Sequence, residues 1–125
     1  MVGTGEVAST LGQYAVNLET LVVRLKATGA KLVWATTTPV REGEPGRFAG
    51  DAKRYNAVAR PIMDRHGVAI DDLWTAVHPR LEELQRPGGD VHFRPEGRAF
   101  LARVVARSIA RELGIEVAGL DPATE

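Results

Sequence analysis

A short apolar run at residues 31–37 constrains the fold of this chain more than any other stretch. It reads Lys31-Leu32-Val33-Trp34-Ala35-Thr36-Thr37, and Thr38-Pro39 ends it. Such a nearly continuous apolar centre with β-branched residues is typical of a strand that is covered on both faces. The chain must therefore supply other segments that can cover each face of this strand.

Amphipathic segments on either side of the run predict helices. The first helix is expected to be capped by Ser9 or Thr10 and to stop at Gly29, with its apolar residues on one stripe. The second is expected over residues 51–66. Pro61 predicts a kink or an early break in this second helix, because proline removes a hydrogen bond inside a helix.

The remaining segments complete an alternation of helices and strands. In chain order they are a surface loop at 40–50, a weaker strand at 68–71, helical turns at 73–85 interrupted at His78-Pro79, a break at 86–89, a helix at 95–113 and a flexible tail at 115–125. This order predicts parallel strands joined by right-handed crossovers, and therefore a three-layer α/β fold in one domain of 125 residues. Two strands offer too little area for the stripes of three helices, so we expect an incomplete sheet that forms homo-oligomers through its exposed edge.

The composition narrows the classes of function. Sixteen Lys plus Arg balance sixteen Asp plus Glu, which argues against nucleic acid or a membrane surface as the partner. No stretch of about 18 apolar residues is present, so no membrane span is expected. The lack of cysteine excludes disulfides and thiolate chemistry and leaves the compartment unknown. Three scattered histidines without a carboxylate cluster predict no metal site, and nothing in the sequence indicates a cofactor.

A polar loop before the last predicted helix holds the best candidates for catalysis. Asp90 and His92 lie two residues apart, directly before Pro95 and Glu96 open that helix. Histidine suits proton transfer near neutral pH, and a neighbouring carboxylate can fix its tautomer. The pattern by itself favours a solvated loop histidine, because Asp-x-His occurs by chance in many proteins. His66 is expected at a helix C-terminus and His78 at the surface.

Four motifs follow one another in a specific order. They are Tyr14 to Lys26, Lys31 to Pro39, Tyr55-Asn56-Ala57-Val58-Ala59, and Asp90-Val91-His92-Phe93-Arg94-Pro95-Glu96-Gly97. The ordered set, from about Gly3 to Leu113, resembles the C-terminal half of the SGNH, or GDSL-type, hydrolases. The resemblance implies a flavodoxin-like parallel sheet and the hydrolysis of acetyl or acyl esters, often on carbohydrates or lipids, by a Ser nucleophile, a His base and usually an Asp.

On that likeness His92 matches the catalytic histidine. The family places its acid three residues before the histidine, where this chain has Gly89, whereas Asp90 lies two before. Asp90 orients His92 from a shifted loop, or a backbone carbonyl does so, or Asp90 only ends the loop. Thr37, Thr38 and Phe93 are the expected substrate contacts.

The nucleophile of that family has no counterpart in the sequence. A Gly-Asp-Ser motif is absent, as are the oxyanion-hole glycine and the Gly-x-Asn block, so the chain is expected to begin just after these N-terminal blocks. Ser9 is more simply a helix cap and Ser108 a structural residue of the last helix. Thr36-Thr37-Thr38 are expected to form a wall and to make hydrogen bonds, and Asn56 to bond a local loop.

Two hypotheses remain open. The first is the C-terminal portion of an ester hydrolase that acts on a small-molecule or carbohydrate ester, with His92 as base. The second is a catalytically inactive fragment or α/β interaction module that retains the scaffold. For the 125 residues by themselves, the second is the expected state.

Overall fold

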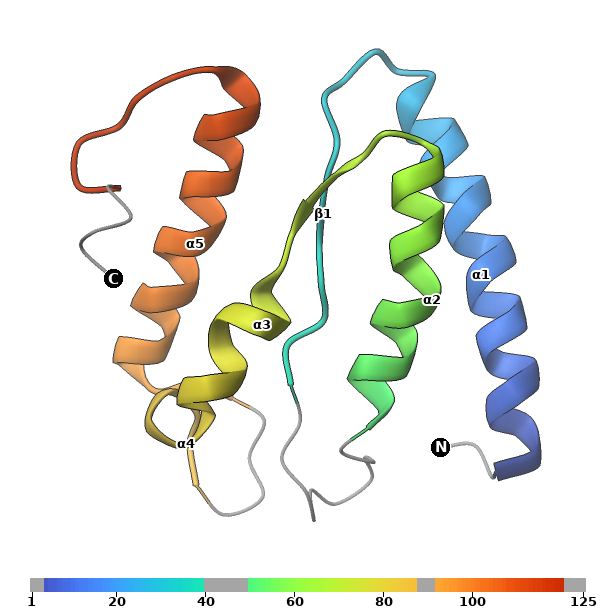
Figure 1. Ribbon diagram of the computed structural model, residues 1–125, viewed down its shortest axis with the longest axis horizontal. Coiled ribbons are helices and arrows are strands. Elements are labelled where there is room, and N and C mark those ends of the chain that lie inside the picture. The colour runs from blue at the N-terminus through green and yellow to red at the C-terminus, as the bar shows by residue number, and fades with distance from the viewer. Residues whose placement is uncertain (1–3, 40–49, 88–91, 121–125) are drawn as a thin grey trace.

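The computed structural model describes residues 4–39, 50–87 and 92–120. Its elements are α1 (Thr4–Lys26), β1 (Val33–Ala35), α2 (Asp51–Arg65), β2 (Ala69–Asp71), α3 (Leu73–Val77), a 3₁₀ turn (His78–Arg80), α4 (Leu81–Leu84) and α5 (Pro95–Leu113). In Figure 1, α1 and α2 lie side by side on one side of the strands and α5 lies on the other. Every helix and strand expected from the sequence is present.

The sheet is small and parallel. Val33 lies opposite Ala69 and Ala35 lies opposite Asp71, and the Thr36 N–H donates to the Asp71 carbonyl at 3.0 Å. Within the described residues the sheet consists of β1 and β2. The parallel α/β arrangement is thus confirmed, whereas the larger flavodoxin-like, three-layer sheet stays a prediction.

One hydrophobic cluster joins α1 and α2 to the sheet. Trp34 and Ile70 occupy the same register position in neighbouring strands, so their side chains point to the same face. There they pack against buried Val22, Met63 and Val68, together with Leu18 and Leu32. The apolar stripes of both helices, which the sequence predicted, bury this face of the strands.

Two details of the first two helices differ from expectation. α1 begins at Thr4, so Ser9 lies inside the helix and the N-cap predicted at Ser9 or Thr10 is wrong. No proline interrupts residues 4–10, and each residue added to a helix gains a hydrogen bond. α2 continues through Pro61 to Arg65, so the predicted early break is wrong, and a kink stays a prediction. Pro61 and Ala57 are both exposed, so water can bond the Ala57 carbonyl, which lacks its helical partner.

A second hydrophobic cluster packs the first half of α5 against α3 and α4. Val77, Leu84 and Phe100 are buried together, with Phe93 packed against them. Gly97 is required there, because a Cβ at that position would lie 2.3 Å from the Leu84 carbonyl oxygen. α5 spans Pro95–Leu113 as predicted, and Gly114 ends it in a left-handed conformation at φ +67°.

Several large apolar side chains remain exposed on the outer faces of α1 and α5 and on the segment after α5. They are Val16, Leu21, Val23, Leu25, Ile109, Leu113, Ile115 and Val117. None of the helices in the described part of the chain is both long enough and apolar enough to span a membrane.

Candidate functional site

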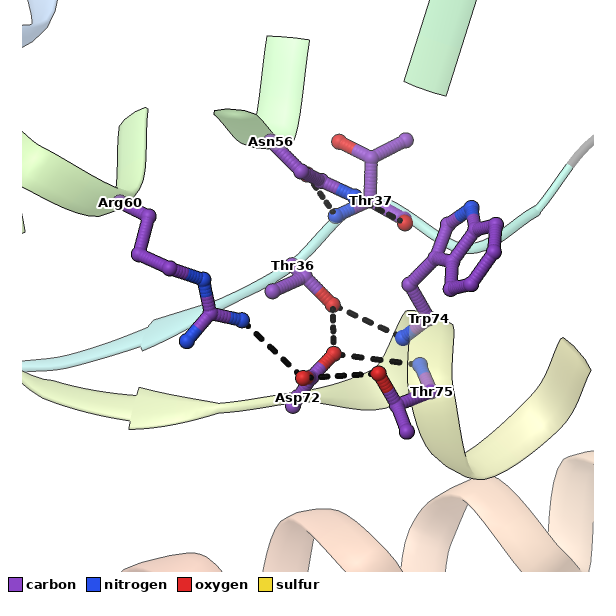
Figure 2. A network of polar contacts seen from close by, with 7 residues as sticks. All are labelled: Thr36, Thr37, Asn56, Arg60, Asp72, Trp74 and Thr75. Atoms are coloured by element: carbon purple, nitrogen blue, oxygen red, sulfur yellow. Dashed lines mark hydrogen bonds and ion pairs between the residues drawn. The ribbon is translucent and has the colours of Figure 1, made fainter. Parts of the chain in front are cut away.

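A network of polar contacts joins the carboxyl ends of the two strands (Figure 2). Asp72 follows β2 and caps α3, accepting from the Thr75 N–H at 3.1 Å and from its hydroxyl at 2.8 Å. Arg60 on α2 donates to the same carboxylate at 3.0 Å. At the end of β1, the buried Thr36 hydroxyl donates to the Asp72 carboxylate at 3.4 Å and accepts from the backbone N–H of Trp74 at 2.8 Å. Thr36 therefore makes the hydrogen bonds that the sequence predicted.

The pKa values of the adjacent Asp71 and Asp72 are shifted in opposite directions. Burial raises the pKa of Asp72, but the hydrogen bonds from Thr75 and the charge of Arg60 outweigh it, so its pKa lies below the ordinary value. Asp71 is buried, and this burial raises the pKa of its carboxyl above the ordinary value in spite of the nearby Arg111. At neutral pH, Asp72 is thus an ionised anchor of the network.

Asn56 fixes the end of β1 from α2. Its side-chain oxygen accepts from the Thr37 N–H at 2.9 Å, and its side-chain nitrogen donates to the Thr37 carbonyl at 3.0 Å. The buried amide thus bonds Thr37 as the backbone of a neighbouring strand would. The sequence predicted a hydrogen bond to a local loop, but the partner is 19 residues away in the chain.

An open groove of about 460 Å³ lies between α2 and the junction of β2 with α3. We call it the α2–α3 groove, and it is lined by Thr36, Lys53, Asn56, Ala57, Arg60, Pro61, Asp64, Asp72, Trp74 and Thr75. Sites in open α/β sheets form at the carboxyl ends of strands, and this groove has that position. Its volume is within the range of small-molecule sites, about 300–1,000 Å³.

His92 lies on a neighbouring segment and does not line this groove. Its side chain is exposed, and its carbonyl accepts from the Arg86 N–H at 2.9 Å. The next residue, Phe93, bridges to Gln85, whose buried side chain donates to the Pro39 carbonyl at 3.5 Å. Gln85 therefore connects the His92 segment to the chain that leaves β1. Figure 1 shows α4 and the first turn of α5 at the end of the molecule toward which β1 runs.

The other predicted site residues lie in different surroundings. Asp90 is outside the described residues. Thr37 is exposed and Thr38 is half-buried, both at the carboxyl end of β1. Phe93 packs on the second hydrophobic cluster. The catalytic and substrate roles of these residues stay predictions.

The sequence reasoning missed Arg60, Asp72 and Trp74 as members of the site. A signal for Asp72 was present, because the acidic pair follows the second predicted strand, where an open α/β sheet has its functional edge. Trp74 stacks on His78 with ring centroids 4.3 Å apart, and His78 is exposed as predicted. Ser108 is buried in α5, which makes it unsuitable as a nucleophile. No cluster of three metal-binding side chains occurs within the described ranges.

Comparison with known proteins gives one match. The model of a family described as the GDSL-like Lipase/Acylhydrolase family matches residues 3–100, which is most of the chain. The matched region includes both strands, α2, the α2–α3 groove and His92. No curated protein and no solved structure matches the chain.

Proposed function

The chain belongs to the GDSL-like lipase/acylhydrolase family, and from this premise we propose that it forms the histidine-bearing part of a carboxylic-ester hydrolase site. The observation that carries the proposal is the extent of the match, because residues 3–100 contain both strand ends and His92. The hydrogen bond from Gln85 to the Pro39 carbonyl supports a single site formed by His92 and the strand ends, since it connects the segment next to His92 to the chain that leaves β1. Acetyl or acyl esters, including those on carbohydrates, are the proposed substrates.

His92 would act first as base and then as acid. Its imidazole would take the proton from a serine hydroxyl as that oxygen attacks the ester carbonyl, and would return it to the departing alkoxide. Water would then attack the acyl-serine. His92 would take a proton from this water and give it to the departing serine oxygen, which releases the carboxylic acid. The exposed position of His92 leaves its ring accessible to both partners. Asp90 is proposed to orient the ring, and Thr37, Thr38 and Phe93 to contact the substrate.

The serine must come from outside these 125 residues in this proposal. The sequence holds no Gly-Asp-Ser motif, and of its two serines Ser9 lies within α1 and Ser108 is buried in α5. The same absence favours a second candidate function, in which the chain is an inactive scaffold or an interaction module of this family. The two candidates differ in whether a complete site ever forms around His92.

A serine-directed probe tests the missing nucleophile. We expect the 125-residue protein, treated with a fluorophosphonate, to remain unlabelled and to hydrolyse a short-chain aryl ester no faster than its His92→Ala variant. Labelling of Ser9 or Ser108 would show that the chain carries its own nucleophile and would overturn this part of the proposal.

A second experiment separates the two candidates. If the coding sequence upstream of Met1 continues in frame into a Gly-Asp-Ser block, the extended protein should hydrolyse the aryl ester. His92→Ala should then lower the rate by about 10²- to 10⁴-fold, the usual contribution of a general base. His66→Ala is the matched control, because His66 pairs with Glu19 at the C-terminal end of α2, before β2 begins, and does not line the α2–α3 groove. An upstream sequence without such a block, or equal rates for the His92 variant, would favour the scaffold.

A further inference from the structure

The polar side chains of Asn56 and Asp72 in the α2–α3 groove are engaged in native hydrogen bonds. Both polar atoms of the Asn56 side chain bond Thr37, and the Asp72 carboxylate accepts from Thr36, Thr75 and Arg60. A ligand would have to break native hydrogen bonds to use the Asp72 carboxylate, and Asn56 is buried with one further amide N–H. The exposed donors of this groove therefore belong to other side chains.

The donors that remain available belong to two cations and one indole ring. Lys53 is exposed, and its ammonium lies over the face of the Trp74 ring, 5.7 Å from the ring centroid. Arg60 gives Asp72 one of its five N–H donors and is otherwise half-exposed. The indole N–H of Trp74 is also buried without an acceptor within the described part of the chain. A groove with spare donors selects a ligand that supplies acceptors.

The charges are arranged unevenly along the groove. Lys53, Arg60 and Asp64 all line it from α2. Lys53 and Arg60 lie two turns apart, about 10 Å along the helix axis, and Asp64 lies one turn further on. Asp72 is compensated by Arg60 and by its other hydrogen bonds. Because Arg60 and Asp72 neutralise each other, the charge that remains in the groove is positive at Lys53 and negative at Asp64, and Arg60 contributes its remaining N–H donors.

We propose that the α2–α3 groove binds the oxyanion of a small organic ligand, a carboxylate or a phosphate, between Lys53 and Arg60. Lys53 acts as a mobile point charge, whereas Arg60 is held in place by Asp72 and presents its remaining N–H groups in a fixed plane. Ala57 and Pro61, which line the groove between the two cations, offer apolar contact to the body of the ligand. This binding site is independent of the proposed ester hydrolysis, because it requires neither His92 nor a serine.

The test is a binding titration that uses Trp74 as reporter. The chain has two tryptophans, so Trp34→Phe leaves Trp74 as the only source of indole emission. Acetate and inorganic phosphate are titrated separately through the millimolar range, at constant ionic strength set with chloride. We expect a saturable change in emission with at least one of them, and the tighter of the two identifies the anion. If Trp34→Phe does not fold, the indole N–H signal of Trp74 in the NMR spectrum of the unaltered protein serves as the readout.

Two variants decide the role of the cations. Lys53→Gln should weaken binding by about tenfold, the loss expected for one charged hydrogen bond. Arg54→Gln is the matched control, since Arg54 lies on the same helix but pairs with Asp51 outside the groove, and it should bind as the unaltered protein does. The absence of saturation with both anions, or equal affinities for Lys53→Gln and the unaltered protein, would overturn the proposal.

Discussion

Replacing Gly97 with alanine should force the start of α5 away from Leu84 at the end of α4. A Cβ at position 97 would lie 2.3 Å from the Leu84 carbonyl oxygen and 3.0 Å from Cδ2 of Phe93. Carbon and carbonyl oxygen normally approach to about 3.3 Å, so one of the two backbones must move by about 1 Å. A change of rotamer cannot relieve the contact with Leu84, because backbone meets backbone there.

The expected loss follows from two opposing effects. Extra volume in a packed site costs about 1–3 kcal/mol. Alanine recovers up to about 1 kcal/mol through its higher helix propensity. Because the clash is with a backbone atom, the cost should lie at the upper end of this range, and we therefore expect the free energy of unfolding to fall by about 2 kcal/mol. The shift also stretches the bond from the Arg94 N–H to the Leu84 carbonyl, now 2.8 Å, which anchors the segment after His92.

Urea unfolding measures this loss, and hydrogen exchange of the Arg94 amide reports the local opening. Gly12→Ala is the matched control, because Gly12 lies in α1 and a Cβ there meets no atom within 4 Å. That control should gain about 0.5–1 kcal/mol. An unfolding midpoint for Gly97→Ala equal to or above that of the unaltered protein would refute the reasoning that α5 and Leu84 are in close contact.

Three further predictions concern the core, the electrostatics and the surface. Asn56→Ala should cost about 1–3 kcal/mol, because it removes two hydrogen bonds to the Thr37 backbone at about 0.5–1.5 kcal/mol each, and should speed amide exchange at Thr37. The raised pKa of Asp71 means that the folded protein binds its proton more tightly than the unfolded chain does, so stability should fall as the pH rises from about 3.9 through the raised pKa. Asp71→Asn should remove that step from the pH profile of urea unfolding, and an unchanged profile would exclude Asp71 as its source. The exposed apolar side chains on α5 should promote self-association, which Ile109→Glu together with Leu113→Glu should reduce in sedimentation; a protein that is monomeric without these changes would contradict this expectation.

Helices and strands were predictable because their signals are local. The residues of α5 show a helical period between Pro95 and Gly114, and each of these two residues favours the helix end at which it lies. The β1 and β2 runs are β-rich and bounded by turns. The local signal failed at Ser9 as a helix start and at Pro61 as a helix stop, because a capping residue or a proline only shifts the preference of the backbone. In both cases the helix continues past the residue.

The sequence by itself determined the order of elements, the parallel α/β class and the family, and it marked His92 through the order of its motifs. Only the tertiary structure decided that Asn56 bonds the end of β1, that Gln85 ties the His92 segment to Pro39, and that Lys53 and Arg60 share one groove. The physical reason is distance along the chain. Hydrogen bonds and charge pairs between segments tens of residues apart leave no periodic trace in the sequence, and they form only when packing of the apolar stripes brings those segments together.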